Sequence, residues 1–156
     1  MFCEPAIIEV TLSWIPVDAN GTLPTNAIEA KPGLYIIRAH HESDIIPGKW
    51  SGTTPQASVS YGGHEIKVTK FEVLCDTSVF KNDPPYKWVE ACHGSAPFLA
   101  IRGGRTETKE PLYIARALVD GEWCTGKVHK SWACAFFPLN GIENTIHQYE
   151  VLCLRD

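Results

Sequence analysis

Lysine follows glycine at two matching places in this sequence, Gly48-Lys49 and Gly126-Lys127. Fixing a lysine side chain costs conformational entropy, so a lysine repeated in a turn or at a strand start indicates a partner that holds it. A solvated lysine after a glycine turn accounts for the pattern equally well, and both interpretations stay open. Neither pair belongs to a phosphate-binding loop, because the pattern G-x-x-x-x-G-K-[ST] is absent.

Three further charged positions recur in both halves of the chain. They are Arg38 and Arg116, Glu65 and Glu143, and Glu72 and Glu150. Each arginine lies in a segment expected to form a strand, and the simplest expectation is an ion pair with one of the two glutamates of its own half. Contact with a ligand is the alternative.

The sequence contains no recognisable set of catalytic or metal-binding side chains. Its six histidines do not recur at equivalent positions, and the adjacent pair His40-His41 would point to opposite faces of a strand. The patterns G-x-S-x-G and H-E-x-x-H are both absent. We therefore expect neither an enzyme nor a bound metal or cofactor.

Composition and charge narrow the class of protein. The 156 residues, 44% of them hydrophobic, suit one compact domain or two half-domains with a shared core. A net charge of -4 gives no electrostatic case for nucleic acid or a membrane surface. The first residues do not resemble a secretory signal, and no apolar run approaches the ~20 residues that span a bilayer. We expect a cytoplasmic protein without membrane insertion; a processed mature form is the alternative.

None of the six cysteines forms a C-x-x-C pair, so a zinc site is not expected. The cysteines are Cys3, Cys75, Cys92, Cys124, Cys134 and Cys153. In a reducing compartment they are expected to be buried thiols, whereas disulfides are the alternative in a secreted protein.

The two lysine pairs belong to a longer internal repeat, in which four blocks of the first half fall on four blocks of the second in one register. The blocks are Leu34 to Ala39 on Leu112 to Ala117, Gly48-Lys49 on Gly126-Lys127, Gly63 to Glu65 on Gly141 to Glu143, and Phe71 to Cys75 on Tyr149 to Cys153. We divide the chain into an N-terminal strand extension (1–13), a first repeat (14–75), a linker (76–87) and a second repeat (88–156). The second repeat carries the longer loop before its Leu112 block.

Short strands are expected throughout both repeats. The segments are Ile7 to Trp14 as an extra first strand, Leu34 to Ala39, Ser58 to Tyr61, Ile66 to Cys75, Leu112 to Leu118, Trp132 to Leu139 and Thr145 to Leu154. The fold class predicted is all-β, with two tandem antiparallel β-rich repeats packed with pseudo-two-fold symmetry.

In this order the blocks resemble the DM-nine repeat, a family found in tandem pairs in small invertebrate proteins. The blocks that carry the resemblance are Trp14, Leu34 to Ala39, Pro47 to Lys49, Gly63 with Glu65, and Phe71 to Leu74, and their counterparts from Trp88 to Leu152. The resemblance implies a β-rich domain pair, lectin activity towards mannose-containing glycans, a role in innate immune pattern recognition, and a homodimer. It also implies a sugar site made by the lysine of the G-K pair and an acidic residue in the loop before the Leu-Tyr-Ile block.

Carried over to this chain, the site lysines are Lys49 and Lys127. The acidic position falls on Glu29 in the first repeat, and on Thr106 with its neighbour Glu107 in the second. The recurring Glu65 and Glu143 complete the candidate carbohydrate-binding set. If only one repeat binds sugar, we expect it to be the second, which has the longer loop.

The hypothesis from sequence is therefore a non-enzymatic lectin for mannose-containing glycans or microbial surface polysaccharides, cytoplasmic or released by an unconventional route. The alternative is a non-catalytic protein-interaction or structural module that keeps the fold and has lost the sugar site.

Overall fold

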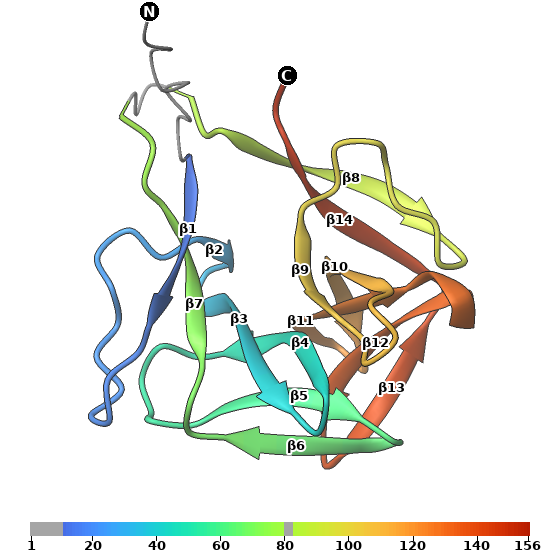
Figure 1. Cartoon of the computed structure of the whole chain (residues 1–156), viewed down its shortest axis with the longest axis horizontal. Coiled ribbons are helices and arrows are strands. Elements are labelled where there is room, and N and C mark those ends of the chain that lie inside the picture. The colour runs from blue at the N-terminus through green and yellow to red at the C-terminus, as the bar shows by residue number, and fades with distance from the viewer. Residues whose placement is uncertain (1–10, 80–82) are drawn as a thin grey trace, which may run out of the picture.

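Antiparallel β-strands make up most of the described chain (Figure 1). The computed structural model of the protein describes residues 11–79 and 83–156. The first half contains β1 (Leu12–Pro16), β2 (Glu29–Lys31), β3 (Leu34–His41), β4 (Asp44–Trp50), β5 (Ala57–Tyr61), β6 (His64–Val68) and β7 (Glu72–Asp76). The second half contains β8 (Tyr86–Cys92), β9 (Arg102–Arg105), β10 (Pro111–Val119), β11 (Glu122–His129), the 3₁₀ turn η1 (Lys130–Trp132), β12 (Cys134–Leu139), β13 (Ile142–Ile146) and β14 (Gln148–Leu154). The all-β prediction is confirmed.

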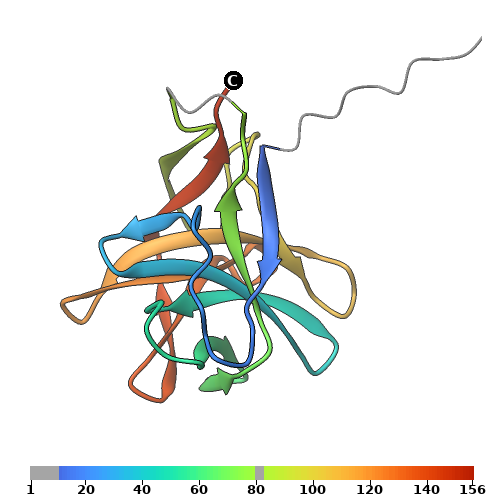
Figure 2. The same cartoon turned by 90° about the vertical axis from the view of Figure 1, so that its left-hand side faces the viewer.

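The strands pair in one antiparallel path that runs through both halves. Its order is β1-β7-β3-β4-β5-β6 and then β13-β12-β11-β10-β14-β8. Beside this path, β2 pairs with β3, while β9 pairs with both β10 and β4. The halves meet where β6 pairs with β13 through His64 and Ile142. The hairpins β5-β6 and β12-β13 on either side of this junction lie at the end of the molecule opposite the C terminus (Figures 1 and 2).

The two arginines are held by ion pairs, as predicted, and the partner is the second of the two candidate glutamates in each half. Arg38 Nε lies 2.7 Å from Glu72 Oε1, and Arg116 Nη2 lies 3.2 Å from Glu150 Oε2. Each guanidinium also covers a tryptophan ring of the strand at its end of the path, two strands away, at 4.7 Å in β1 and 4.3 Å in β8. The arginines therefore stabilise the sheet, and Glu65 and Glu143 are left for another role.

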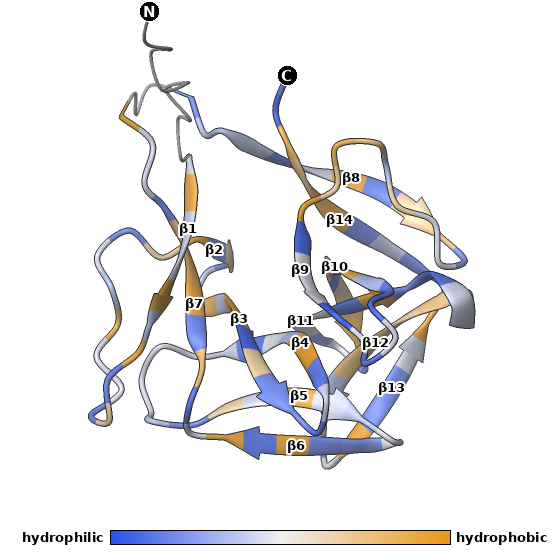
Figure 3. Ribbon diagram, in the orientation of Figure 1, coloured by the Kyte–Doolittle hydropathy of each residue, from blue (hydrophilic) through white to orange (hydrophobic). Residues whose placement is uncertain are grey.

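Three apolar clusters hold the strands together. One lies within the first half around Ile37 and Val73, and one within the second half around Ala115 and Val151. A third, which includes Ile36 and residues of β10 and β14, lies between the halves. Strands such as β6 alternate polar and apolar residues along their length (Figure 3), which is the pattern of a strand with one face in a core.

The β-rich segments predicted to close each repeat each contain parts of two strands. Ile66 to Cys75 is divided between β6 and β7, and Thr145 to Leu154 between β13 and β14. The break is required by the topology, because β6 pairs with β5 whereas β7 pairs with β1 and β3. Trp132, predicted at the start of a strand, ends the η1 turn instead, because Ala133 adopts a left-handed conformation with φ of 58°.

The predicted N-terminal strand falls partly outside the described residues, which begin at residue 11. Within them β1 contains Trp14, which is paired with Leu74. The second half has a strand in the matching place, since Trp88 in β8 is paired with Leu152.

No helix among residues 11–79 and 83–156 is long and apolar enough to cross a membrane. Five of the cysteines are free thiols, four of them buried, and Cys3 lies outside the described residues.

The glycine of each G-K pair lies inside a strand, β4 or β11, and not in a turn or at a strand start as the sequence suggested. A Cβ atom at Gly48 would lie 2.0 Å from the carbonyl oxygen of Ser58, and one at Gly126 would lie 2.1 Å from that of Phe136. The neighbouring strand thus packs so closely that only glycine fits, which explains why both halves have it.

Gly48→Ala is expected to lower the free energy of unfolding by at least about 2 kcal/mol, because the new methyl group overlaps a backbone oxygen that cannot rotate away. Urea unfolding followed by tryptophan fluorescence measures the change. An unchanged unfolding midpoint would show that β4 and β5 are not packed this closely.

Candidate functional site

The two halves are joined at their β-hairpin turns by reciprocal hydrogen bonds. The backbone amide of Glu65 donates to the carbonyl of Gly141, and that of Glu143 donates to the carbonyl of Gly63, both at 3.0 Å. The side chains repeat the exchange, since Gly63 N donates to Glu143 Oε1 at 3.0 Å and Gly141 N donates to Glu65 Oε1 at 2.9 Å. Each glutamate therefore caps the turn of the opposite half and keeps its second oxygen for another contact.

Lys127 is buried beside this junction, with only 6% of its side chain exposed. Its Nζ donates to the carbonyl of Ser60 at 2.8 Å and forms an ion pair with Glu143 Oε2 at 3.1 Å. The rings of Tyr61 and Phe136 lie 5.9 and 5.6 Å from the nitrogen. Because an ammonium group has three N–H bonds and only the contact with Ser60 is a hydrogen bond, Lys127 can donate to a further acceptor.

Two buried oxygens next to Lys127 lack a hydrogen bond within the described residues. They are Ser60 Oγ and Glu143 Oε2, and the ion pair of Glu143 with Lys127 does not have hydrogen-bond alignment. Buried polar atoms are nearly always paired in folded proteins, so unpaired ones require an explanation. A ligand that donates hydrogen bonds at this place would supply the missing partners.

These groups border a hollow of about 620 Å³, which we call the Lys127 hollow. Its walls include the carboxylates of Asp44, Glu107, Glu110 and Glu143 and the rings of Tyr61, Trp132 and Phe136. The Trp132 residue is 67% exposed, because the η1 turn holds it at the surface. The hollow has the size of a small-molecule site and combines aromatic faces with convergent polar groups.

The loop 106–110 forms one wall of the Lys127 hollow, and Thr106 shapes that loop. Its hydroxyl accepts a hydrogen bond from the backbone amide of Glu110 at 3.1 Å, and the Glu110 carbonyl accepts one from Thr106 N at 2.9 Å. The amide of Glu107 donates to Asp44 Oδ1 at 2.8 Å, which ties the loop to the first half. The structure thus places Thr106 within the wall and Glu107 at the rim.

A second acid in this wall is linked to a histidine. Glu110 accepts hydrogen bonds from the amide and the hydroxyl of Ser131, at 2.9 and 2.7 Å, and lies 3.4 Å from His129 Nε2. Burial alone would raise the pKa of Glu110, but the bonds from Ser131 and the nearby histidine outweigh it and lower that pKa. Burial also lowers the pKa of His129, and the Glu110 carboxylate offsets this only in part.

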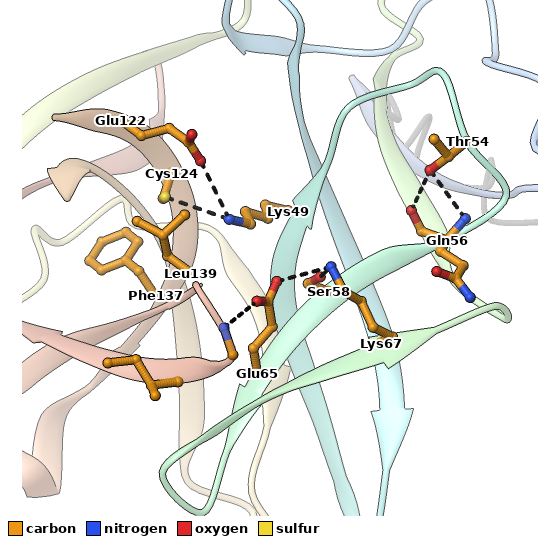
Figure 4. A network of polar contacts seen from close by, with 12 residues as sticks. Lys49, Thr54, Gln56, Ser58, Glu65, Lys67, Glu122, Cys124, Phe137 and Leu139 are labelled. Atoms are coloured by element: carbon orange, nitrogen blue, oxygen red, sulfur yellow. Dashed lines mark hydrogen bonds and ion pairs between the residues drawn. The ribbon is translucent and has the colours of Figure 1, made fainter. Parts of the chain in front are cut away.

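Lys49, the counterpart of Lys127, borders a different hollow of about 620 Å³, which we call the Lys49 hollow (Figure 4). Its Nζ lies 3.9 Å from Glu122 Oε2 and 3.8 Å from Cys124 Sγ. Glu65 lies nearby. Burial alone would raise the pKa of Glu65, but the hydrogen bond from Gly141 and the neighbouring lysines keep it below its usual value.

Six of the seven predicted site residues are therefore divided between two places, and the seventh, Glu29, lies apart from both. Lys127, Thr106, Glu107 and Glu143 line the Lys127 hollow, whereas Lys49 lines the Lys49 hollow with Glu65 beside it. Glu29 lines neither of them. It accepts a hydrogen bond from the Tyr35 hydroxyl at 3.3 Å and borders a smaller hollow.

Glu29 lies apart because β2 leads almost directly into β3, so the first half has no long loop that could carry the acid over the lysine. Sequence reasoning missed Trp132, His129 and Glu110, which line the Lys127 hollow. A search for recurring residues cannot find them, because the register of the repeat places Ser51 opposite His129.

Comparison with known proteins identifies a matching family model, a relative in sequence and a similar fold. A family model described as the DM9 repeat matches residues 29–146, which confirms the resemblance found in the sequence. Natterin-3 of Thalassophryne nattereri is 27% identical over 166 residues, a match that covers 98% of this chain and 42% of natterin-3. The crystal structure of the nematode sperm cell motility protein MFP2B has a similar fold, with a TM-score of 0.66 at 20% identity over 96% of this chain and 48% of that one. This chain thus spans less than half the length of either protein.

The lowered pKa of His129 predicts a loss of stability in mild acid. The unfolded chain protonates this histidine near pH 6.5, before the folded chain does, so stability falls as the pH drops through that value. In His129→Gln the loss of unfolding free energy between about pH 7.5 and 5.5 is expected to be smaller than in the parent. Urea unfolding across that range measures it, and equal losses in the two proteins would contradict the assignment.

Proposed function

The chain belongs to the DM9 repeat family, and on that premise we propose that it is a non-catalytic carbohydrate-binding protein whose main site is the Lys127 hollow. The observation that carries the proposal is the buried pair of Lys127 and Glu143, which has unused hydrogen-bonding capacity beside the exposed ring of Trp132.

The polar and aromatic side chains of the Lys127 hollow are complementary to the hydroxyl groups and the C–H face of a sugar ring. A sugar hydroxyl can accept from an unused N–H of Lys127 while a neighbouring hydroxyl donates to Glu143 Oε2. The C–H face of the ring can pack on Trp132 or Phe136, as apolar surface packs on aromatic rings. A volume of about 620 Å³ accommodates one or two sugar rings.

We further propose that the preferred ligand is mannose or a mannose-containing glycan, such as those of microbial surfaces. Family membership supports this choice, because the DM-nine resemblance implies lectin activity towards mannose-containing glycans. A carboxylate that accepts from neighbouring hydroxyls can distinguish sugars by the orientation of those hydroxyls. Each charge-assisted hydrogen bond contributes roughly 1.5–3 kcal/mol before desolvation is subtracted. A single site of this kind binds weakly, with a Kd on the order of 0.1–1 mM.

Weak single sites acquire useful strength through multivalency. We propose that the two repeats pack with pseudo-two-fold symmetry and that two chains form a homodimer, so that several sites face one glycan-coated surface. Linked sites can raise the apparent affinity by about 10² or more. This property suits a role in innate immune recognition of microbes by a protein that is cytoplasmic or released by an unconventional route.

Trp132→Ala tests the site without removing a buried group, because this ring is 67% exposed. The substitution is expected to weaken binding of methyl mannoside about tenfold through loss of the stacking surface, and to leave the thermal unfolding midpoint unchanged. Titration followed by NMR chemical shifts measures the affinity. The matched control is Phe98→Ala, which removes a 98% exposed ring that does not line the hollow.

Lys127→Met gives the complementary test, because methionine fills a similar volume without the ammonium group. A variant that folds and still binds methyl mannoside like the parent would show that the site lies elsewhere. If the parent itself binds no sugar on a glycan array, the function is that of the alternative, a protein-interaction or structural module.

A further inference from the structure

We propose that the Lys49 hollow binds an acidic saccharide, a sugar that carries a carboxylate or a sulfate group. The two halves of the chain would then recognise different classes of sugar. This inference rests on residues that do not form the Lys127 hollow, so it does not depend on mannose binding there.

The two hollows have opposite charge. Three lysines and one glutamate line the Lys49 hollow, namely Lys31, Lys49, Lys67 and Glu122, and the carboxylate of Glu65 lies beside it, so the positive charges still outnumber the negative ones. Four carboxylates and a single lysine line the Lys127 hollow. The Glu122 side chain is also 64% exposed, so solvent screens its charge. The Lys49 hollow therefore favours an anion, whereas the other does not.

Lys49 lacks the close partners that Lys127 has. Only 17% of its side chain is exposed, yet its contacts with Glu122 and Cys124 are 3.9 and 3.8 Å long. Among residues 11–79 and 83–156 the carboxylate oxygen nearest to this ammonium group is that of Glu122, at 3.9 Å. A nearly buried cation with such distant partners has N–H groups available for an oxyanion, and a charge-assisted bond to one is shorter and stronger than either present contact.

The other two lysines line the same hollow, Lys31 from β2 and Lys67 from β6. Lys31 Nζ lies 4.1 Å from the centre of the Trp123 ring, which also lines the hollow, and this cation–π contact does not pair the lysine with a carboxylate. Lys67 Nζ donates to Ser58 Oγ at 3.2 Å and lies 3.3 Å from Glu65 Oε2 (Figure 4). With 62% of its side chain exposed, Lys67 can turn towards a bound anion.

The size and the polar wall of the hollow indicate a sugar that bears the anion, and not a free ion. A volume of about 620 Å³ is far larger than one oxyanion needs. The remaining wall contains the hydroxyl groups of Ser51, Thr54 and Ser58 and the amide of Gln56, which suit the hydroxyl groups of a sugar ring.

The test is titration of the full chain with glucuronate, with glucose and with inorganic sulfate, each followed by NMR chemical shifts including the indole N–H of Trp123. Glucuronate is expected to bind at least about tenfold more tightly than glucose, and to bind more weakly as salt is raised. Equal binding of glucuronate and glucose would overturn the proposal. Binding of inorganic sulfate as tight as that of glucuronate would overturn the saccharide part and leave a simple anion site.

Lys49→Met is expected to weaken glucuronate binding about tenfold, and Lys67→Gln, at a more exposed position, to weaken it by a smaller factor. Lys87→Gln is the control, since it removes a lysine that does not line the hollow. Equal effects of Lys67→Gln and Lys87→Gln would overturn the proposal even if Lys49→Met fails to fold. Methyl mannoside binding should be the same in Lys67→Gln as in the parent, which separates this site from that of Lys127.

Discussion

The reciprocal capping of the two β-hairpin turns is the constraint on which the rest of the structure depends. The carboxylates of Glu65 and Glu143 each accept an amide hydrogen of the opposite turn, next to the pairing of β6 with β13. The same exchange places the carbonyl of Ser60, from the first half, within reach of Lys127, from the second. The Lys127 hollow therefore exists only where the two halves meet, because residues of both halves line it.

The two halves share these strands and turns but differ in the loop that precedes the Leu34 and Leu112 blocks. In the second half the loop 106–110 separates β9 from β10 and lines the Lys127 hollow, whereas β2 of the first half leads almost directly into β3. The loop 106–110 supplies the carboxylates of Glu107 and Glu110 to the Lys127 hollow. In the first half, Lys31 at the end of β2 lines the Lys49 hollow instead. Loops tolerate such changes because they lie on the surface and leave the core clusters untouched.

The sequence predicts the shared part of this structure well and the divergent part poorly. The all-β class, the strands around Leu34 and Leu112 and the arginine ion pairs follow from residues that recur in register. The split of each closing segment into two strands does not, because it depends on which strands become neighbours. The aromatic wall of Trp132 and the pair of Glu110 with His129 occur in one half alone, so recurrence gives no sign of them.

The close packing at Gly48 and Gly126 bears on how relatives of this chain should be interpreted. The glycine of the G-K pair is required by the backbone of the adjacent strand, whatever occupies the hollow beside it. A conserved G-K pair would therefore identify the architecture and the position of the lysine, and would carry little information about the ligand. Specificity within such a family would have to be inferred from the residues that surround the lysine, one hollow at a time.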